Sequence, residues 1–313
     1  MNQAQGRRIS IGGQALIEGI MMKGPYKTAM AVRHTSGEIV LEEWENKNER
    51  PRFWRLPFFR GMYGMVESFV TGYKCLMRSA ELAGLEEESS ERDEKKEKIL
   101  LSVLMSIASV LGILLSVGLF MFLPSFLYKL TARWIDSNLD SSIATNAVLR
   151  GIFEGLLRMI LFIVYISLVS LMKDIRRTFM YHGAEHKTIF CYENGEELTV
   201  ENIRRQSRFH PRCGTSFMIL TMLVGMVISM CIQVDAVWMR TLIKILLLPV
   251  TVGIGYELIK WTGRKNNRLT RIIAAPGLWI QHITTKEPDD SMIECAIAAF
   301  KPVIPQESDS ERF

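Results

Sequence analysis

Long apolar runs alternate with polar stretches along this chain, and four of the runs have the character of membrane-spanning helices. They cover residues 99–128, 152–172, 217–232 and 237–259. A helix needs about 20 apolar residues to cross the ~30 Å hydrocarbon core of a bilayer, and only the first two runs reach this length without interruption. The pattern predicts about four transmembrane helices, with a re-entrant hairpin as the alternative for the last two.

Five charged residues fall inside these runs, and one of them, Glu257, lies near the end of the last run. Glu154 and Arg158 are four positions apart, so on a helix they share a face, and we expect them to pair with each other. A functional role is the alternative, because charged groups inside a span are costly to keep. Arg240 and Lys244 lie in the first turns of the last run, and we expect their side chains to extend to the membrane surface.

The polar segment before the first run is long enough to fold. Residues 28–33 and 38–44 read as two strands joined at Ser36-Gly37, and the run 9–22 is also strand-like but contains three glycines. Apolar residues between positions 58 and 77 then recur at helical spacing, which predicts a helix packed on the protein or on the bilayer surface. Residues 86–98 form a mixed-charge linker. These patterns predict a small α+β segment.

Lysine and arginine gather on alternate connections between the runs. They are dense in residues 92–98, 173–212 and 260–271, whereas the connection 129–147 holds only Lys129 and Arg133. Positive residues near span ends stay in the cytoplasm. We therefore expect a multi-pass protein of the cell membrane, in contact with the lipid bilayer, with both termini and the central loop in the cytoplasm.

The composition excludes several other classes. The 313 residues are 48% hydrophobic and 23% charged, with a mean hydropathy of +0.13, which is too apolar for a disordered chain. A net charge of +5 is too small and too scattered to predict a nucleic-acid partner. Five cysteines without a C-x-x-C pair argue against a disulfide framework, and the N-terminus lacks the apolar core of a signal peptide.

The candidate chemistry lies in the central loop. In the stretch YHGAEHK, His182 and His186 are four residues apart and Glu185 is three from the first, so on a helix all three share one face. Two imidazoles one turn apart can bind one Zn²⁺, and a neighbouring carboxylate can bind it too or act as a base. The alternative is a pair of hydrogen-bonded helical histidines at a membrane surface.

A second pair of ligand types follows in the same loop. His210 and Cys213 come about 24 residues later, which is far enough for the chain to return to the first pair. Nitrogen and sulfur ligands favour zinc, whereas a site that uses Glu185 in place of Cys213 would admit iron or manganese.

The number of ligands decides what such a site does. If His182, His186, His210 and Cys213 all bind, the tetrahedron is closed and the metal is structural. If only three bind, water can take the fourth position and Glu185 can accept its proton. In a third interpretation Cys213 is a nucleophile paired with His210.

Five stretches of the chain resemble one family. They are GGQALIEGIMMKGP (12–25), PFFRG (57–61), YHGAEHK (181–187), HPRCGTSF (210–217) and EPDDSMIECAIAAF (287–300). In this order, over nearly the whole chain, they resemble the YqhQ-like bacterial membrane proteins. The resemblance implies a multi-pass membrane protein and a metal-dependent enzyme, a description that rests on the same His and Cys residues. It implies no substrate.

Together these patterns predict a mainly α-helical, polytopic membrane protein. Its expected parts are a cytosolic α+β segment (1–98), two transmembrane helices (99–175), a cytosolic loop with the metal site (176–215), two further transmembrane helices (216–262) and a cytosolic tail (263–313). The leading hypothesis is hydrolysis of a membrane-associated substrate, with His182, His186 and His210 as metal ligands and Glu185 as the base. The alternative is a metal-stabilised scaffold that docks a cytosolic protein without catalysis.

Overall fold

The computed structural model describes residues 11–46, 56, 59–84, 94–138, 146–264 and 267–305, and it divides into two compact units. The first, called the sheet unit here, comprises residues 1–86, 166–216 and 274–313. The second, called the helical unit, comprises residues 87–165 and 217–273. Residues 86–93 of the expected charged linker lie outside the described residues. Each unit is therefore built from segments that are far apart in the sequence.

The sheet unit contains a four-stranded antiparallel sheet in the order β1-β2-β3-β4. The strands are β1 (Gly12–Leu16), β2 (Gly19–Lys23), β3 (Lys27–Arg33) and β4 (Ile39–Glu45). The predicted hairpin is confirmed as β3 and β4, with Gly37 at positive φ in its turn. The glycine-containing run upstream divides into β1 and β2, because Glu18 takes a left-handed conformation (φ 49°) that reverses the chain.

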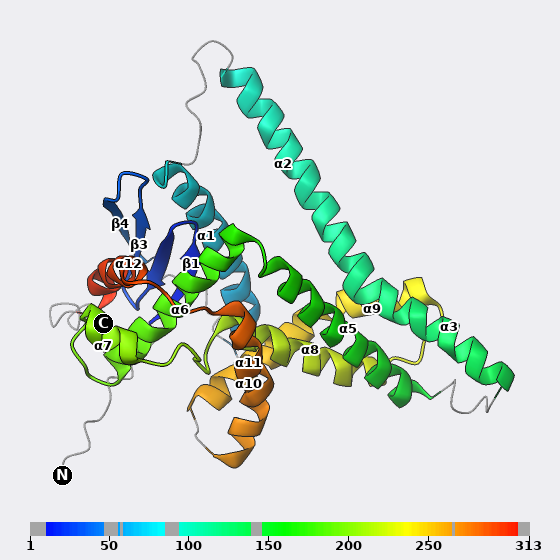
Figure 1. Ribbon diagram of the computed structural model, residues 1–313. Helices are drawn as coiled ribbons and strands as arrows, with labels where there is room; N and C mark the ends of the chain where they lie inside the picture. The colour runs from blue at the N-terminus through cyan, green and yellow to red at the C-terminus, as the bar shows by residue number, and fades with distance from the viewer. Residues whose placement is uncertain are drawn as a thin grey trace. The chain divides into compact units, whose positions relative to one another are not determined.

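Helices cover both faces of this sheet. On one face Ile20, Met22, Ala29 and Ala31 pack against α6 (Lys173–Glu193) and α12 (Asp290–Phe300). On the other face Leu16, Met21, Met30 and Val32 pack against α1 (Phe59–Leu82). Alternate side chains of a strand point to opposite faces, and the cross-strand partners Met21 and Met30 accordingly belong to one cluster. Figure 1 shows the blue strands with green α6 and red α12 beside them.

Helix α1 forms at the helical spacing that the sequence predicts, but it uses small residues to contact the sheet. Its buried positions are Gly61, Gly72, Cys75 and Ser79, and Gly72 lies against the Gln14 side chain of β1. Four large apolar residues of the predicted stripe, Val66, Phe69, Val70 and Tyr73, are exposed instead, with Phe69 at 71%. The sheet unit also includes the short helix α7 (Val200–Arg205) and a 3-10 turn, η3 (Lys301–Val303).

The helical unit is built from long apolar helices. They are α2 (Glu94–Val117), a π-helical turn η2 (Gly118–Phe122), α3 (Leu123–Asn138), α5 (Ala147–Val169), α8 (Gly214–Met230), α9 (Val237–Leu246), α10 (Leu248–Arg264) and the first part of α11 (Arg268–Thr284). The chain is thus mainly helical with a small N-terminal sheet, as predicted.

Two helices of the described chain are long and apolar enough to cross a membrane, fewer than the four expected. They are Ile107–Trp134, which runs through η2, and Ala147–Val169. The pair α9 and α10 reaches span length only when counted together, and it bends by 49° at Leu247. Pro249 accounts for the break, because its ring nitrogen cannot donate to the preceding turn. Helix α8 has 17 residues, fewer than the about 20 that a full crossing of the bilayer needs.

The charged residues inside the helical unit do not pair as expected. Glu154 is fully buried and accepts hydrogen bonds from Lys244 (2.6 Å), Arg240 (3.0 Å), Arg150 (3.1 Å) and Ser229 (2.9 Å). The expectation that Arg240 and Lys244 reach the membrane surface is therefore wrong, because Glu154 holds both of them inside. We call Glu154 and these four donors the Glu154 cluster.

The predicted partner of Glu154 has another role. Arg158 donates from Nε to the main-chain oxygen of Phe120 (2.8 Å), which lies in the π-helical turn. A π turn misaligns the main-chain hydrogen bonds of a helix, and Arg158 supplies a donor at that point. The expected Glu154–Arg158 pair is thus replaced by two separate interactions.

Candidate metal centre

The candidate site is built on a helix that is polar yet buried. Within α6, the residues from Tyr181 to Tyr192 are almost all buried, although the helix carries His, Glu, Lys and Thr side chains there. Strand β1, helix α12 and helix α7 pack around it. A helix that buries polar side chains must give them partners, and the contacts of each side chain therefore indicate what it does.

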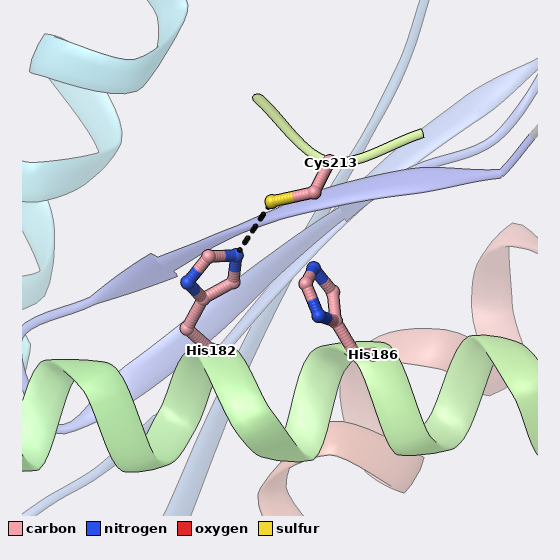
Figure 2. A group of neighbouring side chains, drawn as sticks. All are labelled: His182, His186 and Cys213. Carbon is pink, nitrogen blue, oxygen red and sulfur yellow. Dashed lines mark hydrogen bonds between the residues drawn. The ribbon is translucent and has the colours of Figure 1, made fainter. Parts of the chain in front are cut away.

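Three potential ligand atoms meet at one point. The Sγ atom of Cys213 lies 3.2 Å from Nε2 of His182, and ligand atoms of His182, His186 and Cys213 all lie within 4.8 Å of one another. Figure 2 shows both imidazoles rising from α6 toward the thiol. Ligands of a tetrahedral zinc ion stand about 3.4–3.6 Å apart, given bonds of about 2.1 Å to nitrogen and 2.3 Å to sulfur. The three atoms can therefore hold such an ion after small adjustments.

The far side of each imidazole ring is fixed by the main chain. Nδ1 of His182 is 2.8 Å from the carbonyl oxygen of Thr284, and Nδ1 of His186 is 2.6 Å from that of Arg208. A carbonyl can only accept, so each Nδ1 carries a hydrogen and Nε2 is the atom available on the thiol side. Metal-binding histidines usually have this arrangement, in which the second nitrogen donates to a fixed acceptor.

The thiol and the first histidine are electrostatically coupled. Although burial raises the pKa of the Cys213 thiol, the charge of His182 and its hydrogen bond hold that pKa well below the usual range. Burial lowers the pKa of His182, but the Cys213 thiolate outweighs it and raises the pKa to about 9. Cys213 also directly precedes α8, whose N-terminus favours a negative charge. The cluster therefore contains a thiolate, the form of cysteine that binds metals.

Glu185 lies beside the cluster without joining it. Its side chain is 6% exposed and lines a cavity of about 170 Å³ together with His186, Cys213 and Gly13. Among the residues that the structure describes, none donates a hydrogen bond to its carboxylate. Burial raises the pKa of Glu185, against the lowering effect of His182 and His186. It is a buried carboxylate with free acceptor capacity, which makes it suited to receive a proton.

His210 lies on the wall of the same cavity but turns its ring nitrogens elsewhere. Nδ1 accepts from the main-chain N–H of Arg212 (3.3 Å), and Nε2 lies 3.6 Å from a carboxylate oxygen of Glu193. Its ring centre is 5.6 Å from that of His186. Burial, with His186 nearby, lowers the pKa of His210 to about 4, so the ring is neutral at ordinary pH. The structure thus places Cys213, rather than His210, next to the first two histidines.

The partner of the thiol also differs from the one considered for a cysteine nucleophile. Cys213 faces His182, not His210, and its Sγ further contacts Thr215 (3.2 Å to Oγ1). Cys213 lies next to His182 because residues 208–213 pack over α6, where the Arg208 carbonyl accepts a hydrogen bond from Nδ1 of His186.

Several residues that support the site were missed by sequence reasoning. Gln281 binds the main chain of His210 on both sides, accepting from its N–H (2.7 Å) and donating to its carbonyl (2.8 Å). Gly183 leaves room for the carbonyl of Lys286, which lets the chain carrying Thr284 lie against α6. Glu193 could have been found, since it lies eleven residues after His182, three helical turns along the same face. Gln281 had no such signal.

These features define a class: a mainly helical protein with apolar helices of membrane-spanning length and a buried His-His-Cys cluster. The chain belongs to the family described as "Protein of unknown function (DUF1385)", whose pattern matches residues 56–306. It is 38% identical over 309 residues to "Uncharacterized protein YqhQ" of Bacillus subtilis (strain 168), covering 96% of this chain and 94% of that protein. No solved structure matches it. The resemblance expected from the motifs is confirmed, while neither comparison bears on metal or activity.

Proposed function

We propose that this protein is a membrane-anchored, metal-dependent hydrolase whose metal is bound by His182, His186 and Cys213. The observation that carries the proposal is the cluster of three ligand atoms within 4.8 Å, beside a cavity that Glu185 lines. Three protein ligands leave one position of a tetrahedron for water, as in catalytic zinc sites. The substrate enters from the cavity side.

Glu185 acts as the general base. A bound cation would lower the pKa of water in the open position toward ~7. The Glu185 carboxylate has no donor to lose among the described residues, so it takes the proton at little cost as water adds to the substrate. It then passes the proton to the leaving group.

Zinc is the metal that this ligand set favours. A thiolate and two imidazoles are borderline-soft ligands, which suit Zn²⁺ better than Mn²⁺ or Mg²⁺. Iron or manganese would be favoured instead by a site that replaces Cys213 with the Glu185 carboxylate, so the metal found in the protein also reports which ligands are used.

The alternative function, a metal-stabilised scaffold, requires a closed site. A closed tetrahedron would need His210 as the fourth ligand, and its Nε2 faces Glu193 instead. A scaffold also has no use for a buried carboxylate on the cavity wall. Both observations favour the open, catalytic site.

Replacing Glu185 by Gln tests the hydrolase. The variant keeps the size of the side chain and should retain zinc and folding, while Glu185-dependent hydrolysis falls by about 10²–10⁴. Zinc must be measured in the same preparation by elemental analysis. His34→Gln is a matched control, because His34 lies in the β3–β4 turn and, among the described residues, forms hydrogen bonds with its turn neighbours alone. Full cellular function of zinc-loaded Glu185→Gln protein would contradict the hydrolase and leave the scaffold.

The shared core of the sheet unit supports one membrane arrangement. Strands β1 to β3, helix α6 and helix α12 bury side chains in one cluster, and we therefore place residues 11–46, 173–193 and 290–300 on the same side of the membrane. The chain between them must then cross an even number of times. Helix α5 and the preceding span account for one pair of crossings.

Helices α8, α9 and α10 form a hairpin that enters the membrane and leaves it on the same side, without a full crossing by α8, whose 17 residues are too few. Met230 packs on Gly151 and Met226 on Gly155, so α8 runs antiparallel to the spanning helix α5 through a G-x-x-x-G contact. Ser229 of α8 donates a hydrogen bond to Glu154 of α5. Glu154 lies 15 residues before the C-terminal end of α5, so the contact is about 22 Å along that helix from this end. A hairpin is therefore favoured over a single bent crossing.

The positions of basic residues favour a cytoplasmic location for both termini and for the metal centre. A cysteine placed in residues 139–145, in a background with Cys231 replaced by Ser, should react with a membrane-impermeant maleimide from outside intact cells. Reaction only after the cells are opened would reverse the orientation.

A further inference from the structure

Strand β1 lies at the edge of the sheet, and its free side faces the candidate metal centre. The hydrogen bonds between β2 and β3 show which main-chain groups of each strand point outward. The N–H of Gly24 donates to the carbonyl of Lys27, so the even-numbered residues of β2 form the hydrogen bonds to β3. Because the direction alternates along a strand, the odd-numbered residues of β2 form those to β1. Met21, paired with Gln14, therefore bonds to β1. By the same alternation, Gly13 and Ala15 direct their N–H and C=O groups away from the sheet.

The outer edge of β1 contacts α1 at one end, and its other end has no hydrogen-bond partner among the described residues. Ile17, next in the outward series, donates its N–H to the Ser79 hydroxyl of α1 (3.3 Å). The outward groups of Gly13 and Ala15 bond to none of the described residues. Gly12 and Gly13 line the cavity that also contains Glu185, His186 and Cys213. Within the described part of the chain, an unpaired stretch of strand edge thus borders the candidate metal centre.

Resting on the proposed function, we infer that the substrate of this hydrolase is an extended peptide segment, which adds to β1 as a fifth antiparallel or parallel strand. Peptide backbones are recognised in this way wherever a sheet edge is free. Gly13 has no side chain, and its backbone lies against the Glu185 side chain, so a chain bonded to Gly13 passes beside the general base. The edge aligns the substrate and Glu185 receives the proton.

The size of the cavity agrees with a long substrate that enters only in part. Sites that enclose a whole small molecule measure about 300–1,000 Å³, whereas this cavity measures about 170 Å³. The reaction is the hydrolysis of one amide bond. Water adds to the carbonyl carbon, Glu185 accepts its proton, the C–N bond breaks, and the proton passes to the leaving amine.

The experiment uses purified, zinc-loaded, full-length protein in detergent and heat-denatured casein with a quenched fluorophore as the probe. We expect cleavage by the unchanged protein and a rate about 10²–10⁴-fold lower with Glu185→Gln. Mass spectrometry then identifies a cleaved bond, and a synthetic peptide around it is made with single N-methyl groups along its backbone. Methylation at alternate positions should lower kcat/KM about tenfold, because each removes one bond to Gly13 or Ala15, while the positions between have little effect.

The experiment modifies the substrate backbone and not the strand, because a side chain added at Gly13 would also displace Glu185. Equal effects of methylation at all positions would overturn binding to the strand edge. Glu185-dependent hydrolysis of 4-nitrophenyl acetate without cleavage of casein would overturn the peptide substrate and leave the proposed hydrolase. The absence of Glu185-dependent hydrolysis of both probes would overturn the peptide inference and the hydrolase together.

Discussion

Two buried glutamates illustrate opposite uses of the same side chain. Glu154 in the helical unit is fully buried and accepts hydrogen bonds from three cationic side chains and a serine. Glu185 in the sheet unit is almost as deeply buried, yet no described residue donates to it. A saturated carboxylate is fixed by its donors, whereas an unsaturated one retains its capacity to accept a proton or a ligand.

The number of hydrogen-bond donors around a buried carboxylate distinguishes a structural role from a functional one more clearly than its burial or its charge does. An intramembrane ionisable residue is a functional candidate by default, and by that rule Glu154 would be the better one. Its contacts indicate instead that it joins α3, α5, α8 and α9 through Ser125, Arg150, Ser229, Arg240 and Lys244. Glu185, to which none of the described residues donates, is the carboxylate placed beside a thiolate and a cavity.

The largest effect is expected from replacing Glu154 by Gln. Three buried cations would lose their counter-charge, which should cost about 3–5 kcal/mol of folding stability. Unfolding of the purified protein in detergent, followed by circular dichroism, measures the loss. Ser229→Ala is the matched control and should cost about 1 kcal/mol, since it removes one neutral partner. If Glu185→Gln destabilised the fold as much as Glu154→Gln, the contrast between the two glutamates would be wrong.

The next effect concerns the metal ligands. His182→Ala and Cys213→Ser each remove one of the three proposed ligands, so zinc affinity should fall at least about 100-fold and the purified proteins should lose stoichiometric zinc. His210→Ala should keep its zinc, because the His210 ring nitrogens face Arg212 and Glu193. Elemental analysis of the three variants decides the matter. Zinc lost from His210→Ala but retained by Cys213→Ser would indicate a site made of three histidines.

The pH dependence of zinc binding sharpens the role of the thiolate. His182, with a pKa of about 9 beside Cys213, is protonated at neutral pH and must release that proton to bind. Apparent affinity should therefore rise about tenfold per pH unit up to about pH 9 and then level off. Competition with a chelator of known pH response measures it. In Cys213→Ser the rise should end well below pH 9, because no thiolate then outweighs the effect of burial on the pKa of His182. An unchanged profile would mean that the thiolate does not control His182.

The smallest effect is expected at Gly183. An added methyl group would meet the Lys286 carbonyl and shift the chain that supplies the Thr284 acceptor to His182. Loss of such an outer partner lowers metal affinity by about 10–100-fold, so Gly183→Ala should bind zinc more weakly without losing it. Gly64→Ala in α1 is the control, since nothing lies within 4 Å of its added carbon. Equal zinc affinity in both variants would separate the Thr284 contact from the metal.

The sequence predicts best those features that depend on neighbours along the chain. The hairpin β3–β4, the helical face that carries His182 and His186, and the two long spans follow from local periodicity. The Glu154 cluster and Gln281 do not, because all their partners except Arg150 lie 65 to 90 positions away. Helix α12 was expected only as part of a tail, although its Met292, Ile293 and Phe300 are fully buried in the sheet unit.

The two longest apolar helices differ in length, which has a consequence for the lipids around them. At 1.5 Å per residue, the 28 residues of Ile107–Trp134 extend about 42 Å and the 23 residues of Ala147–Val169 about 35 Å. Both exceed a hydrocarbon core of ~30 Å, the first by much more. Hydrophobic mismatch of this kind is relieved by tilting or by local thickening of the bilayer. Acyl-chain length should thus tune the fit of this protein to its membrane, with thicker bilayers matching the longer helix better.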